Sequence, residues 1–393
     1  MIPGMSFFAG WKGWRKFKKL AWDWRNIVIY SESGQDWHQF SGLIEHLNGP
    51  LGHKTVYVTS DASDPGMSRQ NDNFRALYIP QGLFLTIFFQ VNRSDVFVLT
   101  MMDLQNLQLK RSLHPVHYVY LFHSMGSTHM VDNENSFDHY ESLFCTGPHQ
   151  VEEIRKREEL KGLPPKHLFD YGHPRLEEVI AQGVAYQGGR EAGQPATVLI
   201  APTWGDSSIF NTCGAELIDV LLEAGYRVIM RPHYQSNIRT PAVISAVRAV
   251  YSGHERFEYV DQMGETDSIM RSDILVSDWS AMAIEYALGL EKPVLFIDVE
   301  RRIRNPSWRE LGLEPVESSI RSLVGEIVSP AALHQAPAAV ESLIADPDRF
   351  RAKIRELRDT MIFRLGHSIP GGAGEIARLA DEKAHARRLA EDE

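Results

Sequence analysis

From residue 27 onward, short runs of β-branched and aromatic residues alternate with helix-like segments, and this alternation limits the possible folds more than any other feature. The runs in the first half are apolar at nearly every position, as in parallel strands that helices cover on both faces. Such a pattern predicts an α/β domain built on a parallel sheet. The expected strands of this domain span residues 26–30, 54–58, 76–79, 95–99, 116–122, 142–146 and 168–171.

A second series of the same kind follows a segment rich in glycine and polar residues, which we interpret as an interdomain linker. Two βαβ series joined by a linker predict two Rossmann-like domains facing a cleft. The second series has expected strands at 196–201, 226–230, 257–260, 273–276 and 293–297, and expected helices at 215–224, 238–250 and 281–288. The predicted parts are an N-terminal helix (1–24), a first domain (25–182), the linker (183–195), a second domain (196–345) and C-terminal helices that cross both domains (346–393).

Length, charge and cysteine content narrow the class of protein. The 393 residues fit two domains at about 100–200 residues each. A formal net charge of −10 argues against a general nucleic-acid binder, which needs a basic surface. Cys145 and Cys213 form no CxxC pair, so we expect a reducing compartment and no zinc site. The sequence shows neither an apolar run of about 18 residues nor a secretory signal, which predicts a cytoplasmic protein.

Residues 1–24 form a basic and aromatic segment with two open interpretations. On a helix, its apolar side chains face one way and its cations the other. Aromatic residues beside a basic flank are typical of a helix lying in a lipid headgroup layer, here the inner face of the plasma membrane. The alternative is a helix packed on the protein's own surface. The apolar side comprises Phe7, Trp11, Trp14, Phe17, Leu20, Ala21 and Trp24, and the basic side comprises Lys12, Arg15, Lys16 and Lys19.

The sharpest candidate site follows the expected strand at 273–276. Ser277, Asp278 and Ser280 fill a turn before the helix that starts near residue 281. Hydroxyl groups and free backbone N–H groups at a helix start suit a phosphate group, and Glu285 can accept from ribose hydroxyls. The alternative is that these side chains only cap the helix.

Two further segments of the second domain place polar residues at strand ends. Arg231 and His233 leave a strand on a proline-stiffened turn. Arg231 can pair with a diphosphate, and His233 can act as a general acid or donate to a bridging oxygen. Thr203 can contact phosphate, and Trp204 can form a wall of a nucleotide pocket. The alternatives are a solvated surface turn for the first pair and an ordinary packed tryptophan for the second.

The first domain offers His123, which ends its most apolar strand. Gly126, Ser127 and Thr128 follow in what we expect to be a flexible loop near the acceptor. A histidine facing the cleft can take a proton from an acceptor hydroxyl. The alternative is a buried structural histidine, and His129 competes with His123 for the same role.

Several common motifs are missing from the sequence. We find no GxxxxGK[ST] loop, no GxGxxG fingerprint and no GxSxG elbow. No paired-acid metal site is evident either. We therefore expect a reaction that needs neither a metal ion nor another cofactor.

Taken together, five segments resemble those of the CDP-glycerol glycerophosphotransferase family, which builds teichoic-acid-like and capsular polyol-phosphate polymers. The resemblance covers roughly residues 110–380. In place of the family's usual HGT, this chain has His123-Ser-Met125, and Trp279 and Ala281 replace a tyrosine and a serine. The segments are Gly172-His-Pro-Arg175, Ala201-Pro-Thr-Trp204, Arg231-Pro-His233, Ser277-Asp-Trp-Ser280 with Glu285-Tyr286, and Gly371-Gly-Ala373.

The resemblance implies a GT-B-like fold and a transfer reaction. A polyol-phosphate unit would move from a CDP-activated donor to a hydroxyl of a lipid-linked or polymeric envelope acceptor, with release of CMP. His123 would activate the acceptor hydroxyl. Arg231, His233, Ser277, Asp278 and Ser280 would hold the donor pyrophosphate.

Two other functions remain open at this point. One is a GT-B glycosyltransferase that uses a nucleotide sugar and the same strand-end residues. The other is an inactive nucleotide-binding scaffold at the membrane, which would bind nucleotide without turnover of any donor.

Overall fold

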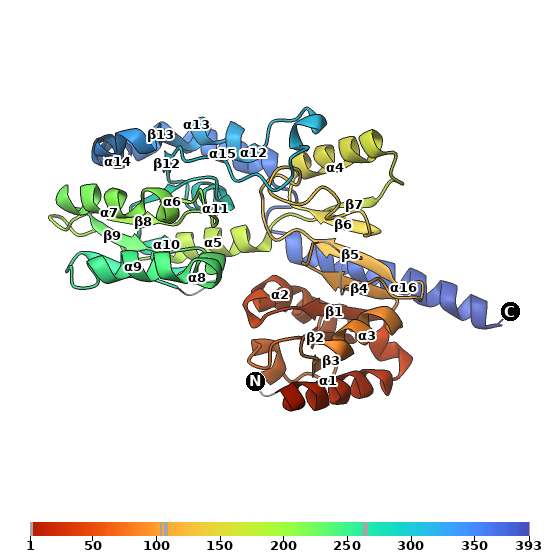
Figure 1. Cartoon of the computed structure of the whole chain (residues 1–393). Helices are drawn as coiled ribbons and strands as arrows, with labels where there is room; N and C mark the ends of the chain where they lie inside the picture. The colour runs from red at the N-terminus through yellow and green to blue at the C-terminus, as the bar shows by residue number, and fades with distance from the viewer. Residues whose placement is uncertain (1–2, 103, 106–108, 262–265, 393) are drawn as a thin grey trace. The chain divides into compact units, whose positions relative to one another are not determined.

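A computed structural model describes residues 3–102, 104–105, 109–261 and 266–392. The chain forms two compact units (Figure 1). The first comprises Met1–His123, Asp132–Pro174 and Ile362–Glu393, and the second comprises Ser124–Val131 and Arg175–Met361. These bounds differ from the domain limits expected from the sequence, because the chain enters the second unit at α5 (Pro174–Ala185), ahead of the expected linker at 183–195.

The first unit is built on a seven-stranded parallel sheet with the order β3-β2-β1-β4-β5-β6-β7. Parallel pairing begins with Ile27 opposite Thr55 on one side and Val96 on the other. Val28 and Tyr30 of β1 enter one hydrophobic core, and Ile27 and Ile29 enter a second core on the opposite face. Burial on both faces explains why the central strands are apolar at nearly every position. The strands are β1 (Ile27–Ser31), β2 (Thr55–Thr59), β3 (Phe74–Tyr78), β4 (Val96–Leu99), β5 (His117–Leu121), β6 (Ser142–Cys145) and β7 (His167–Asp170).

Helices cover both faces of this sheet. Phe40 and Leu43 of α2 share a core with Ile376 and Ala380 of α16 on one face. On the other face, α3 supplies Phe88 and Phe89. The helices of the first unit are α1 (Pro3–Lys18), α2 (Trp37–Asn48), α3 (Leu83–Val91), α4 (Pro148–Lys161) and α16 (Ser368–Asp392), with 3-10 turns at Trp22–Arg25, Gly34–Asp36 and Pro65–Ser68.

Helix α1 packs against α3 and β3. Phe17 is buried in the core, and a Cβ on Gly13 would lie 2.1 Å from the Tyr78 carbonyl oxygen, so glycine allows the helix to approach the sheet closely. The first part of the helix differs, because Phe7 and Phe8 are 50% and 69% exposed. Part of the apolar side of the N-terminal segment therefore packs on the protein itself, and part faces solvent.

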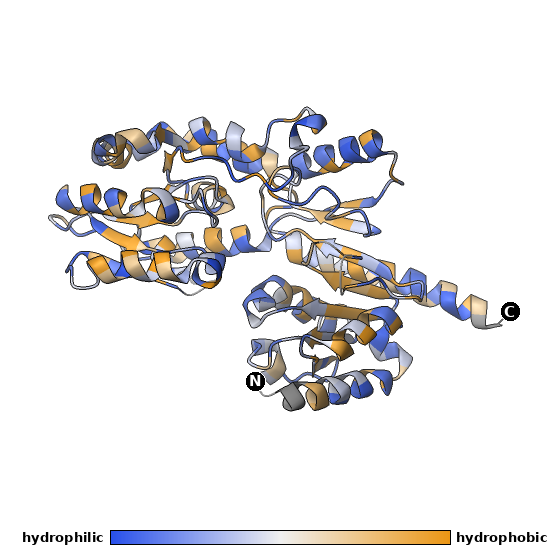
Figure 2. Ribbon diagram, viewed as in Figure 1, coloured by the Kyte–Doolittle hydropathy of each residue, from blue (hydrophilic) through white to orange (hydrophobic). Residues whose placement is uncertain are grey.

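The second unit holds a six-stranded parallel sheet with the order β10-β9-β8-β11-β12-β13. Figure 2 shows that the strands of both sheets are largely hydrophobic. The strands are β8 (Thr197–Ile200), β9 (Arg227–Met230), β10 (Phe257–Tyr259), β11 (Ile274–Ser277), β12 (Val294–Ile297) and β13 (Gly325–Val328).

The helices of the second unit include α15, which packs against α11, whereas α16 returns to the first unit and packs against α2. The helix expected at 238–250 is present over most of its length, but its first two residues belong to a preceding helix. The structure has two helices there, because Pro241 lacks an N–H group and begins the second one. The helices are α5, α6 (Ile209–Thr212), α7 (Gly214–Glu223), α8 (Tyr234–Arg239), α9 (Pro241–Tyr251), α10 (Asp267–Arg271), α11 (Ala281–Leu290), α12 (Val316–Ser319), α13 (Arg321–Val324), α14 (Ala336–Ala345) and α15 (Arg351–Met361), with 3-10 turns at Trp308–Leu311, Pro330–Gln335 and Pro347–Arg349.

Candidate functional site

The candidate site lies where the strand order of the second sheet reverses. From β8, the chain order runs outward through β9 and β10 on one side, and β11 begins the run on the other side. Loops that leave such a pair of strands diverge, and ligands of open α/β sheets bind in the crevice between them. The loops after β8, β9 and β11 carry Thr203 and Trp204, Arg231 and His233, and Ser277 to Ser280. Three predicted motifs thus share one edge of three adjacent strands.

Asp278 and Ser277 hold the loop after β8 in place. The Asp278 carboxylate accepts hydrogen bonds from the backbone N–H groups of Thr203 (2.7 Å) and Ile209 (3.3 Å). The Ser277 hydroxyl donates to the Ala201 carbonyl at 2.8 Å. Both side chains are buried, so their observed role is to shape the site, and a direct role in holding pyrophosphate stays a prediction.

Ionisation of the Asp278 carboxyl group is unfavourable in its buried position. Burial raises the pKa of Asp278 to about 6, against the opposing effect of the backbone N–H donors and of Arg321. Ser280 accepts from the Met282 N–H at 3.3 Å and caps α11, as the simpler interpretation of this turn expected.

Glu285, which the sequence placed near a ribose, lies between two arginines. An ion pair links its carboxylate to the Arg175 guanidinium at 3.3 Å. Burial raises the pKa of Glu285, while the charges of Arg175 and Arg231 lower it. Arg231 is 8% exposed and donates to the Ser268 hydroxyl at 3.3 Å. Arg175 was visible in the Gly172–Arg175 segment but was not proposed as a site residue.

Trp204 stands at the centre of a cationic group. The Arg302 guanidinium carbon lies 3.4 Å from the centroid of its ring, and that of Arg239 lies at 4.8 Å. The His233 ring is 6.3 Å away. Arg302 was missed from the sequence because it follows β12 by several residues in a segment without regular structure. Aromatic and cationic groups in this arrangement suit the base and phosphates of a nucleotide.

His233 has a defined orientation for donating a hydrogen bond. It is the N-cap residue of α8, and its Nδ1 accepts from the Gln235 N–H at 3.1 Å. With Nδ1 as the acceptor, the neutral ring carries its proton on Nε2. The side chain is exposed, so Nε2 can reach a ligand oxygen.

His123 of the first unit follows β5, at the carboxyl edge of its own sheet. Its side chain has exposed surface, but neighbouring atoms displace much of the water around the ring, and this desolvation is the main reason that its pKa is lowered. The charge of His38 is the smaller cause. A histidine with a lowered pKa is neutral at pH 7 and can act as a base.

Acidic residues and a second histidine share this edge. Burial raises the pKa of Glu32, and it raises the pKa of Asp36 to about 6 together with the charge of Glu32. His38, on α2, donates from Nδ1 to the Gln35 carbonyl at 2.7 Å when neutral. These residues directly follow the strand at β1, which was the signal available in the sequence for finding them.

The loop that contains Gly126 and Ser127 is fixed in place, contrary to the expectation of a flexible acceptor loop. The Ser127 N–H donates to the Glu317 carboxylate at 3.0 Å, and its hydroxyl accepts from the Val316 N–H at 2.7 Å. A Cβ on Gly126 would lie 2.4 Å from Glu317, which explains the glycine. His129 is buried and bonds the Leu313 carbonyl at 3.2 Å, as a structural histidine does.

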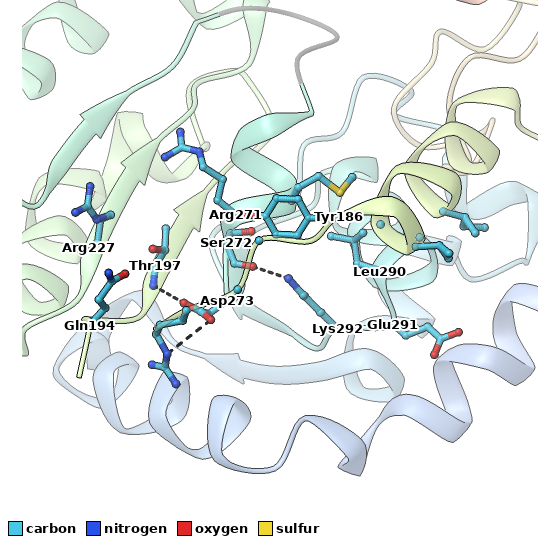
Figure 3. A pocket seen from close by; sticks show the side chains of 18 of the residues that line it. Tyr186, Gln194, Thr197, Arg227, Arg271, Ser272, Asp273, Leu290, Glu291 and Lys292 are labelled. Carbon is cyan, nitrogen blue, oxygen red and sulfur yellow. Dashed lines mark hydrogen bonds and ion pairs between the residues drawn. The ribbon is translucent and has the colours of Figure 1, made fainter. Parts of the chain in front are cut away.

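A large cavity of about 970 Å³ lies in the second unit away from these residues (Figure 3). It is bounded by Thr197 and Arg227 at the starts of β8 and β9, the opposite edge of the sheet. Asp273 there accepts from the Thr197 N–H at 2.7 Å, and Lys292 donates to the Ser272 carbonyl at 2.7 Å. None of the described residues that line this cavity belongs to the predicted site.

In the described part of the chain, no group of three or more His, Cys, Asp and Glu residues is placed to hold a metal ion. None of the described helices is long and apolar enough to cross a bilayer.

Comparison with known proteins identifies the segment that holds the strand-end motifs. Residues 160–304 match the family model of CDP-Glycerol:Poly(glycerophosphate) glycerophosphotransferase. This match confirms the resemblance over residues 160–304, which include the loops after β8, β9 and β11, whereas His123 and the Gly371–Ala373 segment lie outside the match. No curated protein matches the chain in sequence.

Solved structures confirm the GT-B-like fold. A glycosyltransferase from Rickettsia africae superimposes with a TM-score of 0.54 and 10% identity, covering 90% of this chain and 98% of its own. The glycotransferase of kitacinnamycin superimposes with a TM-score of 0.54 and 13% identity, covering 90% of this chain and 98% of its own. An α,α-trehalose-phosphate synthase (UDP-forming) from Burkholderia vietnamiensis superimposes with a TM-score of 0.52 and 10% identity, covering 91% of this chain and 98% of its own. At these identities the likeness concerns the fold.

Proposed function

We propose that this protein transfers glycerol phosphate, or another polyol phosphate, from a CDP-activated donor to a hydroxyl of an envelope glycan, lipid-linked or polymeric acceptor. The observation that carries the proposal is the gathering of three motifs at the reversal point of the second sheet, within the segment that matches the glycerophosphotransferase family. The family match supports a transferase of this class. The donor, the acceptor and the release of CMP are our proposal.

The donor binds at the loops after β8, β9 and β11. Trp204 packs against the base, and the Arg302 guanidinium stacks on the Trp204 ring. Arg231, the His233 Nε2–H group and the N–H groups at the start of α11 at Ser280 hold the pyrophosphate. Asp278 holds the loop after β8 and so positions Thr203 and Trp204.

In the transfer step, the acceptor oxygen attacks the distal phosphorus of the donor, and the bond from that phosphorus to the bridging oxygen breaks. His123 takes the proton of the attacking hydroxyl. His233 donates a hydrogen bond from Nε2–H to the bridging oxygen, which stabilises the negative charge as that oxygen leaves as part of the CMP anion. Positioning and charge neutralisation supply most of the rate enhancement in such transfers.

A nucleotide-sugar glycosyltransferase is the second candidate, because the superimposable structures include glycosyltransferases. The two functions differ in the nucleotide that is released. We would incubate the full chain with CDP-glycerol, CDP-ribitol and a panel of UDP- and GDP-sugars, each with a lipid-linked acceptor, and identify the nucleotide product. CMP from a CDP-polyol supports the first function, whereas UDP or GDP from a sugar donor replaces it with the second.

We also propose that the protein is peripheral on the cytoplasmic face of the plasma membrane. Phe7, Phe8 and Trp11 are exposed on α1, and Leu83 at the start of α3 is 61% exposed. Phe7 packs edge-on against Phe84, so the exposed ends of these two helices are neighbours. Basic side chains follow this apolar group in the last turn of α1, as in segments that bind anionic lipid.

A further inference from the structure

A hollow of about 520 Å³ in the first unit combines apolar walls with positive charge. It lies beside α1 and α3, and we call it the α1–α3 pocket. Its volume falls in the roughly 300–1,000 Å³ range of small-molecule sites. The lining residues are Trp14, Phe17, Lys18, Arg25, Ile87, Phe88, Val91, Asn92, Arg93 and His114.

The charges of this pocket are of one sign. Lys18, Arg25 and Arg93 line it, and none of its described lining residues is acidic. Burial lowers the pKa of Arg25, and the charges of Arg93 and Arg387 lower it further, which shows that like charges are crowded here. The acid Asp95 pairs with Arg387 at 3.2 Å. An anion bound in the pocket would relieve this repulsion.

Three lining residues also carry buried polar atoms that have no hydrogen-bond partner among the described residues. They are Trp14 Nε1, Arg25 Nε and Asn92 Oδ1. Leaving such an atom unsatisfied costs about 1–3 kcal/mol. Two of the three are N–H donors, whose dipoles add to the positive potential of the lining.

The apolar part of the lining is equally distinct. Phe17 and Phe88 pack edge-on with ring centroids 4.9 Å apart, and they form part of the core. Val91 is 38% exposed and reaches the surface of the pocket. A hydrocarbon group that binds here would be removed from water, which stabilises the complex by about 25 cal/mol per Å² of apolar area buried.

The larger cavity of the second unit has cations too, and three of them form ion pairs with acids. Arg271 pairs with Glu258 at 2.5 Å, and Arg355 and Arg358 pair with Glu291 at 2.7 and 3.0 Å. In the α1–α3 pocket, by contrast, none of the described lining residues is acidic, so an anion meets no opposing carboxylate there.

We propose that the α1–α3 pocket binds one molecule of an anionic amphiphile, with its phosphate head at Lys18, Arg25 and Arg93 and its hydrocarbon chain against Phe17 and Val91. The chemistry is that of an alkyl phosphate, which a membrane phospholipid and a lipid-linked acceptor share. The proposal does not depend on which donor the protein uses, and its test measures binding alone.

The test is calorimetric titration of the full chain with decyl phosphate below its micelle concentration. Inorganic phosphate supplies the head without the chain, and octyl glucoside supplies a chain with an uncharged head. We expect decyl phosphate to bind at least tenfold more tightly than either, because both parts of the pocket are then occupied. Equal affinity for inorganic phosphate or for octyl glucoside would overturn the proposal, as would the absence of binding.

Variants place the binding in the pocket. The double change Arg25→Gln and Arg93→Gln should weaken decyl phosphate binding about tenfold or more, because charge-assisted hydrogen bonds are lost. The matched control is Lys12→Gln with Lys16→Gln, which removes the same charge from exposed positions of α1 outside the pocket. An equal loss in both double variants would overturn the proposal.

Two further arms separate folding and lipid source. Arg25→Lys with Arg93→Lys keeps the charge and should retain most of the affinity, which a merely misfolded pocket would not. Vesicles that contain phosphatidic acid test the surface as the source of the ligand. If the protein binds the vesicles but does not bind monomeric decyl phosphate, its ligand is the membrane surface, and the pocket proposal is overturned.

Discussion

At the residue scale, the site depends on the protonation of its histidines. His233 Nδ1 accepts the Gln235 N–H, so the neutral ring has an Nε2–H group that can donate a hydrogen bond to the bridging oxygen of the nucleotide. We expect His233→Ala to lower turnover about 10²–10³-fold, as loss of a hydrogen-bond donor to the developing charge does. His334→Ala is the matched control, because His334 is exposed on a 3-10 turn of the same unit. Near-normal turnover of the His233 variant would remove its assigned role.

The lowered pKa of His123 predicts a pH profile. As the base, His123 must be neutral, and activity is lost as the pH falls through its pKa in the folded protein. That pKa lies below the ordinary 6.5. The acidic limb of kcat/KM should therefore fall below pH 6.5, and His123→Ala should abolish this limb. A limb centred at or above pH 6.5 contradicts the assignment.

Asp278 predicts a pH dependence of stability. Its pKa is raised from 3.8 to about 6, so the folded state binds the proton more tightly and stability falls as the pH rises through this range. Relative to Asp278→Asn, the native chain should lose about 2 kcal/mol of unfolding free energy between about pH 4.5 and pH 7. Urea unfolding of both proteins measures the difference, and a constant difference across this range would disprove the effect.

At the scale of elements, α1 shows how one helix serves two surfaces. Trp14 and Phe17 face the core, while Phe7, Phe8 and Trp11 remain exposed. The helical pattern alone gave both groups to one face, since it registers apolar spacing and not the neighbour that covers it. Packing against α3 divides the face, so the exposed group is limited to the start of the helix.

Because only a few apolar residues of α1 are exposed, we predict that these few side chains bind the membrane. Changing Phe7, Phe8 and Trp11 to Ser should reduce flotation with anionic liposomes several-fold, because aromatic side chains anchor at the interface. Changing the exposed Val184 and Val250 of the second unit to Ser is the control. Equal flotation of the native chain and the aromatic variant would refute membrane binding through α1.

Some elements gave no clear signal in the sequence. Strand β13 (Gly325–Val328) contains a glycine and a glutamate, and its two middle residues are partly exposed at the edge of the sheet. An edge strand of this kind lacks the apolar run that marks the central strands. The split between α8 and α9, by contrast, was readable from Pro241.

At the scale of the whole molecule, nucleotide binding should appear as stabilisation. A nucleotide that binds the folded chain and not the unfolded one adds about 2.7 kcal/mol at 100 times its Kd. We expect CDP to raise the melting temperature more than UDP or GDP, and Arg231→Gln to remove most of the increase. Arg227→Gln is the control, because Arg227 lies at the opposite edge of the same sheet. A larger shift with UDP would favour the nucleotide-sugar function.

The sequence by itself determined the two α/β series and the placement of the candidate residues at strand ends. Strands buried on both faces must be apolar throughout, and polar residues that follow them must emerge at one edge of a parallel sheet. These are consequences of local order, so Arg231, His233 and Ser280 could be found without coordinates. His123 could be found in the same way.

Only the tertiary structure decided which strands are neighbours and which side chains are already engaged. Thr203 and Asp278 are 75 residues apart, yet a backbone N–H of one bonds the carboxylate of the other. The order that places β8 beside β11, the fixed loop at Gly126 and the α1–α3 pocket all depend on such contacts. Distant parts of a chain meet through the packing of whole elements, which spacing along the sequence does not encode.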